Sequence, residues 1–283
     1  MESTIESLVE FAKVGDKEAL EMLILRIQDG IYGLAIRMLY NPADAEDATQ
    51  EILIKVITHL SDFRQDCKFN TWVYRIASNH LLTIQKSRTE SREVSFKDFE
   101  NIIESQVSAS CPLPTLSAEQ SLMHQEVMVS CTQGMLLCLD RDLRMAYILG
   151  ELSEISSNQA ANILNITSAA FRKRLSRART LLFNFMKKNC GLVNESRPCR
   201  CSRYVSHIAK DGEINKDNLM FAGHPCRSQK DVVTVEQLRE VSELQRVVTI
   251  FRSHPDYAAP EKFLNSLKQL FDSGKYRLFG EEH

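Results

Sequence analysis

The stretch ISSNQAANILNITSAAFRKRLSRARTLLFNFMKK, residues 155–188, contains the signals for two helices joined by a tight turn. Ser156 followed by Gln159 is a capping-box start, and Asn165 can take the left-handed conformation that ends a helix. Thr167 then provides the N-cap of a second helix. We therefore predict a helix-turn-helix unit over these residues.

The second helix of this unit has an apolar side and a basic side. Its apolar residues recur at four- and three-residue spacing, which forms a stripe that can pack on the first helix: Phe171, Leu175, Ala178, Leu182 and Phe185. No acidic residue occurs between Thr167 and Lys188, so the field over the helix is uniformly positive. This pattern favours DNA binding over the alternative, a solvated basic face on an ordinary core helix.

The composition of the whole chain is that of a globular protein with two or three domains. Its 283 residues are 43% hydrophobic and 25% charged, and no apolar run approaches the length of a membrane span. The N-terminus MESTIESLVEFAK lacks the basic-then-apolar order of a signal peptide. We expect a cytoplasmic protein without membrane insertion, whose eight cysteines are reduced thiols or metal ligands.

Charge is segregated along the chain. The net charge is −2, but residues 1–60 hold eleven Asp and Glu against five Lys and Arg, a local balance of −6. Such segregation suits one surface for a basic partner and another for nucleic acid.

The N-terminal region is predicted to be helical. Ser3 with Glu6 starts a first helix, Gly15 with Asp16 interrupts it, and an amphipathic segment runs from about Lys17 to Tyr40. A third helix starts at Asn41 and Pro42, since Asn can cap and Pro suits the first helical position.

The third helix presents two different sides. One side is apolar and consists of Ala45, Ala48, Ile52, Val56 and Leu60, whereas the other consists of Asp47, Gln50, Glu51 and Ile54. An apolar Ile54 among acids is typical of a protein-docking patch. On spacing alone, a solvated acidic face is an equal alternative.

A loop and a fourth helix follow. Residues 61–68 read as a loop, and Asn70 or Thr71 is expected to cap a helix that runs to about Gln85. This helix interleaves aromatic with basic and amide residues, a chemistry that stacks on unpaired bases and holds phosphates: Trp72, Tyr74, Arg75, Asn79, His80 and Lys86. Core packing of Trp72 is the alternative, and the two interpretations are compatible.

The second half of the chain begins after a polar linker, residues 87–117. Two helices are predicted at about Ala118–Cys131 and Met135–Leu152, and the second supplies apolar residues to the core under the helix-turn-helix: Leu139, Leu143, Ala146 and Leu149. The expected fold is therefore all-α, with two small helical domains on a flexible tether.

Beyond residue 188 the chain carries a cysteine-containing extension. Cys190, Cys199 and Cys201 fall within a dozen residues, with His207 six residues later and Cys226 near His224. These side chains offer a zinc site, a redox-responsive thiol cluster or incidental cysteines, and the spacing is not that of a standard zinc finger.

The rest of the extension is predicted to be mostly helical. Thr234 with Gln237 opens a helix with the apolar stripe Leu238, Val241, Leu244, Val248 and Phe251. Pro260 introduces a last helix with Phe263, Leu264, Leu267 and Phe271.

Taken together, these residues resemble the extracytoplasmic-function group of bacterial RNA polymerase sigma factors over about Leu8–Lys188. The matching stretches are NPADAEDATQEILIKV (41–56), FNTWVYRIASNHLL (69–82) and LSEISSNQAANILNITSAAFRKRLSRAR (152–179). The resemblance implies a region 2-like domain at residues 1–86, the linker at 87–117, a region 4-like helix-turn-helix domain at 118–188, and an extension at 189–283. The implied role is promoter recognition with core RNA polymerase, without catalysis or a required cofactor.

The resemblance also implies roles for single residues. Polymerase docking falls on Asp47, Gln50, Glu51 and Ile54. Promoter melting and strand contact fall on Phe63, Arg64, Phe69, Asn70, Trp72, Arg75 and Asn79, with capture of a flipped base in the loop 62–69. Upstream-element binding falls on Thr167, Ser168, Ala169, Arg172, Lys173, Arg174 and Arg177.

The sequence departs from the family in the helix-turn-helix. Asn165 stands where Gly is usual, and Ala170 stands where a polar residue is usual. Asn158 and Gln159 replace residues that are typically acidic. These departures imply either altered base reading, with contact to thymine methyl groups, or weaker DNA binding.

The partners expected are core RNA polymerase and promoter DNA, with an anti-sigma factor as a further candidate. The alternative function is a stand-alone helix-turn-helix regulator that senses through the cysteines of the extension. An enzyme is not expected, because no glycine-rich phosphate loop occurs. The extension is expected to be regulatory, acting on promoter or polymerase binding.

Overall fold

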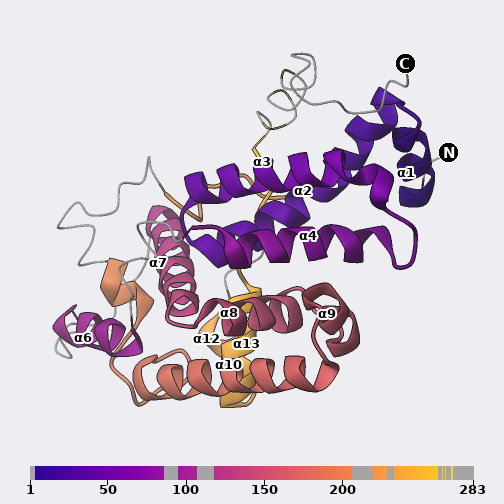
Figure 1. The fold of residues 1–283 in the computed structure, drawn as a ribbon. Coiled ribbons are helices and arrows are strands. Elements are labelled where there is room, and N and C mark those ends of the chain that lie inside the picture. The colour runs from indigo at the N-terminus through magenta and orange to yellow at the C-terminus, as the bar shows by residue number, and fades with distance from the viewer. Residues whose placement is uncertain are drawn as a thin grey trace.

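The computed structural model describes residues 4–85, 95–106, 118–205, 219–227 and 233–260, together with residues 263, 265 and 269. Within these ranges the regular structure is helical, apart from two isolated β-bridges. The predicted all-α fold is therefore confirmed. In Figure 1 the helices form an upper group, α1 to α4, and a lower group that contains α8, α9 and α10.

The upper group consists of α1 (Ile5–Lys13), α2 (Lys17–Leu39), α3 (Pro42–Thr58) and α4 (Phe69–Thr83), with a short 3-10 turn, η1 (Leu60–Asp62), before α4. Thr4, rather than the predicted Ser3, caps α1 by accepting the backbone N–H of Ser7. The predicted start of α3 is confirmed, since the side chain of Asn41 accepts two backbone N–H groups.

The start of α4 differs from the prediction. The helix begins at Phe69, and Lys68 before it makes no side-chain capping bond, so neither Asn70 nor Thr71 is the cap. The Phe69 ring is buried and packs against the rings of Phe63 and Trp72. Burial of this ring fixes the first turn in place of a polar cap.

The lower group consists of α7 (Ala118–Leu137), α8 (Arg141–Tyr147), a π-helical turn η2 (Ile148–Leu152), α9 (Ser157–Leu164) and α10 (Ser168–Asn189). The predicted break after Cys131 is wrong, because α7 continues to Leu137 and the new helix starts after Asp140. The Asp140 side chain accepts the Leu143 N–H at 2.9 Å and caps α8.

A helix that was not predicted, α6 (Phe96–Gln106), lies within the expected linker. The rings of Phe96 and Phe99 pack on Phe185 of α10. Their centroids lie 5.0 Å and 6.0 Å, respectively, from the centroid of the Phe185 ring. A Cβ at Gly134 of α7 would lie 2.8 Å from the Phe99 ring, so the missing side chain permits this close approach. This part of the linker is therefore anchored to the lower group.

The two groups share one continuous core. The guanidinium of Arg144 in α8 is buried and donates to the Met38 carbonyl at the end of α2, and also to the Leu136 and Leu139 carbonyls. In addition, α9 packs against α4. The interface thus contains a buried guanidinium that donates to backbone carbonyls of both the upper and the lower group.

The stretch from Thr234 to Arg252, which was predicted to form one helix, forms two: α12 (Val235–Arg239) and α13 (Glu243–Arg252). The predicted capping box of Thr234 and Gln237 is confirmed. A second capping box, Ser242 with Gln245, starts α13 and changes the register. As a result Leu244 is 51% exposed, and the buried residues of α13 are Val247, Ile250 and Phe251.

Most of the predicted last helix after Pro260 lies outside the described residues, although Phe263 is buried. Of the helices that the structure describes, none combines the length and the apolar character that crossing a membrane requires.

Candidate nucleic-acid interface

The turn between α9 and α10 has the predicted geometry. The hydroxyl of Ser156 caps α9 by accepting the Gln159 N–H, and Asn165 ends the helix in the left-handed region with φ 52° and ψ 45°. Thr167 caps α10 by accepting the Ala170 N–H at 3.1 Å. The full capping box is modified, because the Gln159 side chain bonds to the Ser156 hydroxyl at 2.9 Å.

The two sides of α10 separate as predicted. The whole apolar stripe from Phe171 to Phe185 is buried. Of the predicted upstream-element residues, five are exposed: Thr167, Ala169, Arg172, Lys173 and Arg177. The side of α10 that carries them is therefore open to a groove of DNA.

The other two upstream-element residues are half-buried and hydrogen-bonded within the chain. The hydroxyl of Ser168 donates to Asn158 of α9 at 2.8 Å, and the guanidinium of Arg174 pairs with Asp142 of α8 at 3.1 Å. These contacts orient the first two turns of α10 on the rest of the unit, so Arg174 brings less free charge to the surface than its neighbours do.

The acidic side of α3 faces solvent. Asp47 and Glu51 are exposed, while Gln50 and Ile54 are half-buried. Asp47 and Glu51 also line a groove of about 450 Å³ whose opposite wall is the end of α4 with its following residues. Asp47 and Glu51 therefore share one surface of α3, whereas Ile54 packs in part against the core.

His80 was assigned by sequence to the strand-contact helix, but it lies beneath the acidic side of α3. Its Nδ1 is 2.7 Å from the Lys55 ammonium, and its Nε2 is 3.7 Å from the Glu51 carboxylate. Burial, with a smaller effect of Lys55, lowers the pKa of the His80 imidazole, whereas Glu51 opposes that shift. Nothing in the local sequence signals this contact, because the two helices meet only in the fold.

The aromatic residues before and within α4 form a cluster. Ring centroids of Phe63, Phe69 and Trp72 are 5.3 to 5.7 Å apart, and Phe63 and Phe69 are buried. The Lys13 ammonium donates to the Phe63 carbonyl at 2.5 Å. Phe63 and Phe69 thus support the loop from within, and only Trp72, which is half-buried, offers part of its ring to the surface.

The polar residues of the predicted strand-contact surface differ in exposure. Arg64, Asn70 and Asn79 are exposed. Arg75 is half-buried, and its Nε donates to the backbone carbonyl of Asn162 in α9 at 3.3 Å. The side of α4 that carries Arg75 therefore faces the helix-turn-helix.

Zinc binding was one of three alternatives for the cysteines of the extension, and the residues that the structure describes do not form such a site. Cys190 is buried, and Cys199 and Cys201 are half-buried. Across the described ranges, no three His, Cys, Asp or Glu side chains are placed to hold a metal ion, while His207 lies outside them. A parallel bridge joins the backbones of Cys190 and Cys199, so the chain path around them is set by main-chain pairing.

The thiols of this region are held in their neutral form. Burial raises the pKa of Cys190 and Cys201, and raises that of Cys199 to about 12. Cys131 of α7 lies close to these three thiols, although the sequence did not indicate it. Burial raises the pKa of Cys131, and the three thiols raise it further. A thiol that stays protonated is a weak nucleophile, which argues against a fast redox response.

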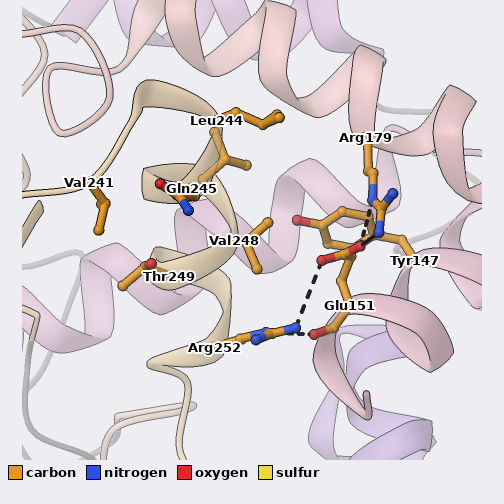
Figure 2. A pocket seen from close by; sticks show the side chains of 10 residues that line it. Tyr147, Glu151, Arg179, Val241, Leu244, Gln245, Val248, Thr249 and Arg252 are labelled. Carbon is orange, nitrogen blue, oxygen red and sulfur yellow. Dashed lines mark hydrogen bonds and ion pairs between the residues drawn. The ribbon is translucent and has the colours of Figure 1, made fainter. Parts of the chain in front are cut away.

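A pocket of about 420 Å³ lies where α13 meets η2 and α10, and Figure 2 shows the side chains that line it. The buried carboxylate of Glu151 pairs there with Arg179 of α10, and the guanidinium of Arg252 in α13 lies 3.9 Å from it. Burial is the main cause that raises the pKa of the adjacent Tyr147 hydroxyl, so this hydroxyl stays protonated. Glu151 therefore connects the basic helix α10 to the extension.

Comparison with known proteins places the chain in a family. The sequence profile described as Sigma-70 region 2 matches residues 23–90. The chain is 32% identical over 178 residues to the RNA polymerase sigma-H factor of Pseudomonas aeruginosa, covering 62% of this chain and 89% of that protein. It is 34% identical over 185 residues to the ECF RNA polymerase sigma-E factor of Escherichia coli K12, covering 64% of this chain and 93% of that protein.

Among solved structures, a co-crystal structure of the sigma factor RpoE with the anti-sigma factor NepR from Bartonella quintana is 24% identical, with a TM-score of 0.40, and covers 59% of this chain and 95% of that one. The two sequence relatives match this chain above 30% identity over nearly their whole length. The chain therefore belongs to the extracytoplasmic-function family of RNA polymerase sigma factors.

Proposed function

We propose that this chain is a promoter-recognition subunit that docks on core RNA polymerase through α3 and binds the upstream promoter element through α10. Its work takes place where polymerase and DNA are, in the cytoplasm, and it involves no catalysis by this chain. The resemblance to sigma-H and sigma-E factors supports this function over most of their length.

The observation that carries the assignment of roles is the presence of two exposed surfaces of opposite charge. The acidic surface of α3 contains Asp47 and Glu51, and the basic surface of α10 contains Arg172, Lys173 and Arg177. A basic surface is required for phosphate contact, whereas an acidic surface repels DNA and suits a protein partner. Two such surfaces on one chain are consistent with a subunit that binds both core RNA polymerase and DNA.

Strand capture near the start site is assigned to the exposed Arg64, Asn70 and Asn79, with the half-buried Trp72 beside them. An unpaired base needs a stacking ring and hydrogen-bonding groups at one place. The buried rings of Phe63 and Phe69 hold this loop in shape. In this proposal the two phenylalanines position the loop, and the exposed polar residues contact the strand.

The docking assignment is tested by charge reversal. Asp47→Lys and Glu51→Lys in the full chain are expected to abolish co-purification with core polymerase, because each places a cation on a surface that is complementary to a basic partner. Glu18→Lys is the matched control, since Glu18 is an exposed acid on α2 outside the acidic surface of α3. Full retention of polymerase by both reversed variants would overturn the docking role.

The same experiment separates the two classes of DNA-binding protein considered from the sequence. A stand-alone regulator binds DNA without polymerase, so its promoter binding is independent of Asp47 and Glu51. Core polymerase that fails to co-purify even with the unmodified chain would favour that class. Polymerase retained by the unmodified chain and by Glu18→Lys, but lost from the other two variants, supports the sigma-factor assignment.

A further inference from the structure

The C-terminal latch, residues 219–227, 233–260 and 263, contacts both groups of helices. Its helices α12 and α13 lie with the lower group in Figure 1, in yellow tones, while its remaining residues reach α2 of the upper group. One segment of chain thus bridges two domains that sequence analysis expected to be tethered loosely.

Asp29 of α2 is the first point at which the latch contacts the upper group. Its carboxylate accepts the Ala259 backbone N–H at 2.8 Å and pairs with the guanidinium of Arg227. The Asp29 side chain is 13% exposed, so both interactions form around a largely desolvated carboxylate. Charge-assisted bonds of this kind are stronger than neutral ones.

Arg37 of α2 is the second contact point. Arg37 is half-buried, and its guanidinium donates to the Pro255 carbonyl at 3.3 Å and lies over the Tyr257 ring, 5.2 Å from the centroid. The Tyr257 ring is buried, and a cation–π contact strengthens as its partners lose contact with water. The latch therefore contacts the Arg37 guanidinium through both a backbone carbonyl and an aromatic ring.

Aromatic pairs complete the contact with α2. Tyr32 stacks on His224 with ring centroids 5.1 Å apart, and Tyr40 meets Phe221 edge to face at 5.2 Å. Tyr32 and Phe221 are fully buried. Side chains of this size contribute most of the burial energy at an interface.

Glu126 of α7 holds the start of the latch. Its buried carboxylate accepts the backbone N–H groups of Met220, Phe221 and Ala222, at 3.0, 2.9 and 2.6 Å. A buried carboxylate is unfavourable unless hydrogen-bond donors satisfy it. Separation of residues 220–222 from α7 would therefore remove the three donors of the Glu126 carboxylate.

The middle of the latch is fixed to the helix-turn-helix domain. Phe251 of α13 packs edge to face on Tyr147, and Arg252 donates from Nε to the Glu151 carbonyl at 2.8 Å. The Glu151 carboxylate also pairs with Arg179 of α10, as Figure 2 shows. The latch is thereby joined to the recognition helix through one buried carboxylate.

With α9 packed on α4, which is here called the closed arrangement, the proposed functional surfaces differ in their access to solvent. Arg75 of α4 is held by the Asn162 carbonyl of α9, so the helix-turn-helix covers that side of the strand-contact helix. Asp47 and Glu51 remain exposed, as do the basic residues of α10. A strand of opened DNA could reach Arg75 only if α9 moved away from α4.

From these contacts we propose that the C-terminal latch is an intramolecular clamp that keeps α9 on α4, and that docking of core polymerase on α3 releases it. The proposal rests on the function proposed above for α3 and α4. In the free chain, α9 then covers the Arg75 side of α4, whereas the acidic surface of α3 is exposed. Polymerase therefore binds first, and contact of α4 with the opened DNA strand follows.

A photo-crosslinking amino acid at position 162 of the full chain reads out the closed state without using thiol chemistry. The unmodified latch is expected to give a high yield of crosslinks from α9 to α4. Phe221→Ala with Tyr257→Ala, which removes two buried aromatic contacts with α2, is expected to lower that yield several-fold. An unchanged yield in a variant with native helix content would overturn the clamp.

A milder variant and a matched control keep the test decisive if the double variant fails to fold. Asp29→Asn weakens both latch contacts at that site and is expected to lower the yield in the same direction. Arg239→Ala is the control, because Arg239 pairs with Glu195 inside the extension and does not touch α2. Equal yields from Asp29→Asn and Arg239→Ala would contradict the proposal.

Addition of core polymerase to the unmodified chain provides the second arm. Crosslinks to α4 are expected to fall several-fold when polymerase binds, and persistence of the full yield in the bound complex would overturn release. If polymerase does not bind at all, the proposed sigma function fails, whereas the comparison of the latch variants still decides whether the clamp exists.

Discussion

His80 is a buried side chain beneath the proposed docking surface of α3, and its protonation affects the stability of the fold. Burial and the neighbouring Lys55 lower its pKa in the folded chain, so the imidazole is neutral where an unfolded chain would begin to take up a proton. As the pH falls below about 6.5, the unfolded state binds more protons, and the free energy of unfolding decreases by at most about 1.4 kcal/mol per pH unit for this group.

We therefore predict that His80→Gln flattens the pH dependence of stability. Urea unfolding between neutral pH and mildly acidic pH measures the slope in the variant and in the unmodified chain. The pKa of His124 is also lowered by burial, so part of the slope should remain. An identical slope in both proteins would show that His80 does not titrate as the geometry implies.

Asn165 is the residue that allows the turn between α9 and α10. It has φ 52°, a conformation that costs most residues about 1–2 kcal/mol and glycine almost nothing. We predict that Asn165→Ala lowers the free energy of unfolding by about 1 kcal/mol and that Asn165→Gly is neutral. Asn162→Ala, an exposed position within α9, is the control, and an equal loss at 162 and 165 would contradict the role of the turn.

At the scale of single elements, local capping signals predicted the starts of several helices. Asn41, Ser156, Thr167 and Thr234 cap helices as expected, because a capping side chain acts on backbone groups two or three residues away. Elements fixed by distant packing were not predicted. The start of α4 depends on a buried Phe69, and α6 depends on aromatic contact with α10.

The register of α13 is an element-scale prediction. Because the second capping box restarts the helix, Ile250 is buried and Leu244 is exposed. Ile250→Ala should reduce the free energy of unfolding by about 2–5 kcal/mol, whereas Leu244→Ala should have little effect. Denaturant unfolding measures both. A larger loss at Leu244 would favour the single continuous stripe that the sequence suggested.

The basic surface of α10 supports a prediction about promoter affinity. Arg172→Ala and Lys173→Ala should each weaken binding to the upstream element by about 1–3 kcal/mol if they read bases. Arg197→Ala, an exposed cation in the extension, should change affinity little. A gel shift on a promoter fragment measures the three. Unchanged affinity for the first two variants would move the DNA contact to another surface.

At the scale of the whole molecule, charge segregation along the sequence becomes two separate surfaces. The acidic N-terminal region supplies the exposed side of α3, and the basic stretch supplies α10. Periodicity predicted both faces, since each is a property of one helix. The contacts of the latch with α2 and η2 could not be predicted, because they join residues far apart in the sequence, such as Asp29 and Ala259, which are 230 positions apart.

The candidate site was therefore predicted unevenly. Asp47 and Glu51 of α3 and Arg172, Lys173 and Arg177 of α10 are exposed as their spacing predicted, whereas Ser168 and Arg174 are half-buried and bonded within the chain. The strand-contact set was mixed, because Phe63 and Phe69 are buried supports and Arg75 faces α9. Burial depends on which elements meet in the folded chain, and the spacing of residues in one helix does not carry that information.

The central claim is that this chain directs core polymerase to promoters through α3. Run-off transcription with purified core polymerase on genomic DNA fragments tests it directly. The chain should produce discrete transcripts that core polymerase alone does not make, and Asp47→Lys with Glu51→Lys should eliminate them. Absence of discrete transcripts with the unmodified chain, or equal transcripts from the reversed variant, would contradict the account.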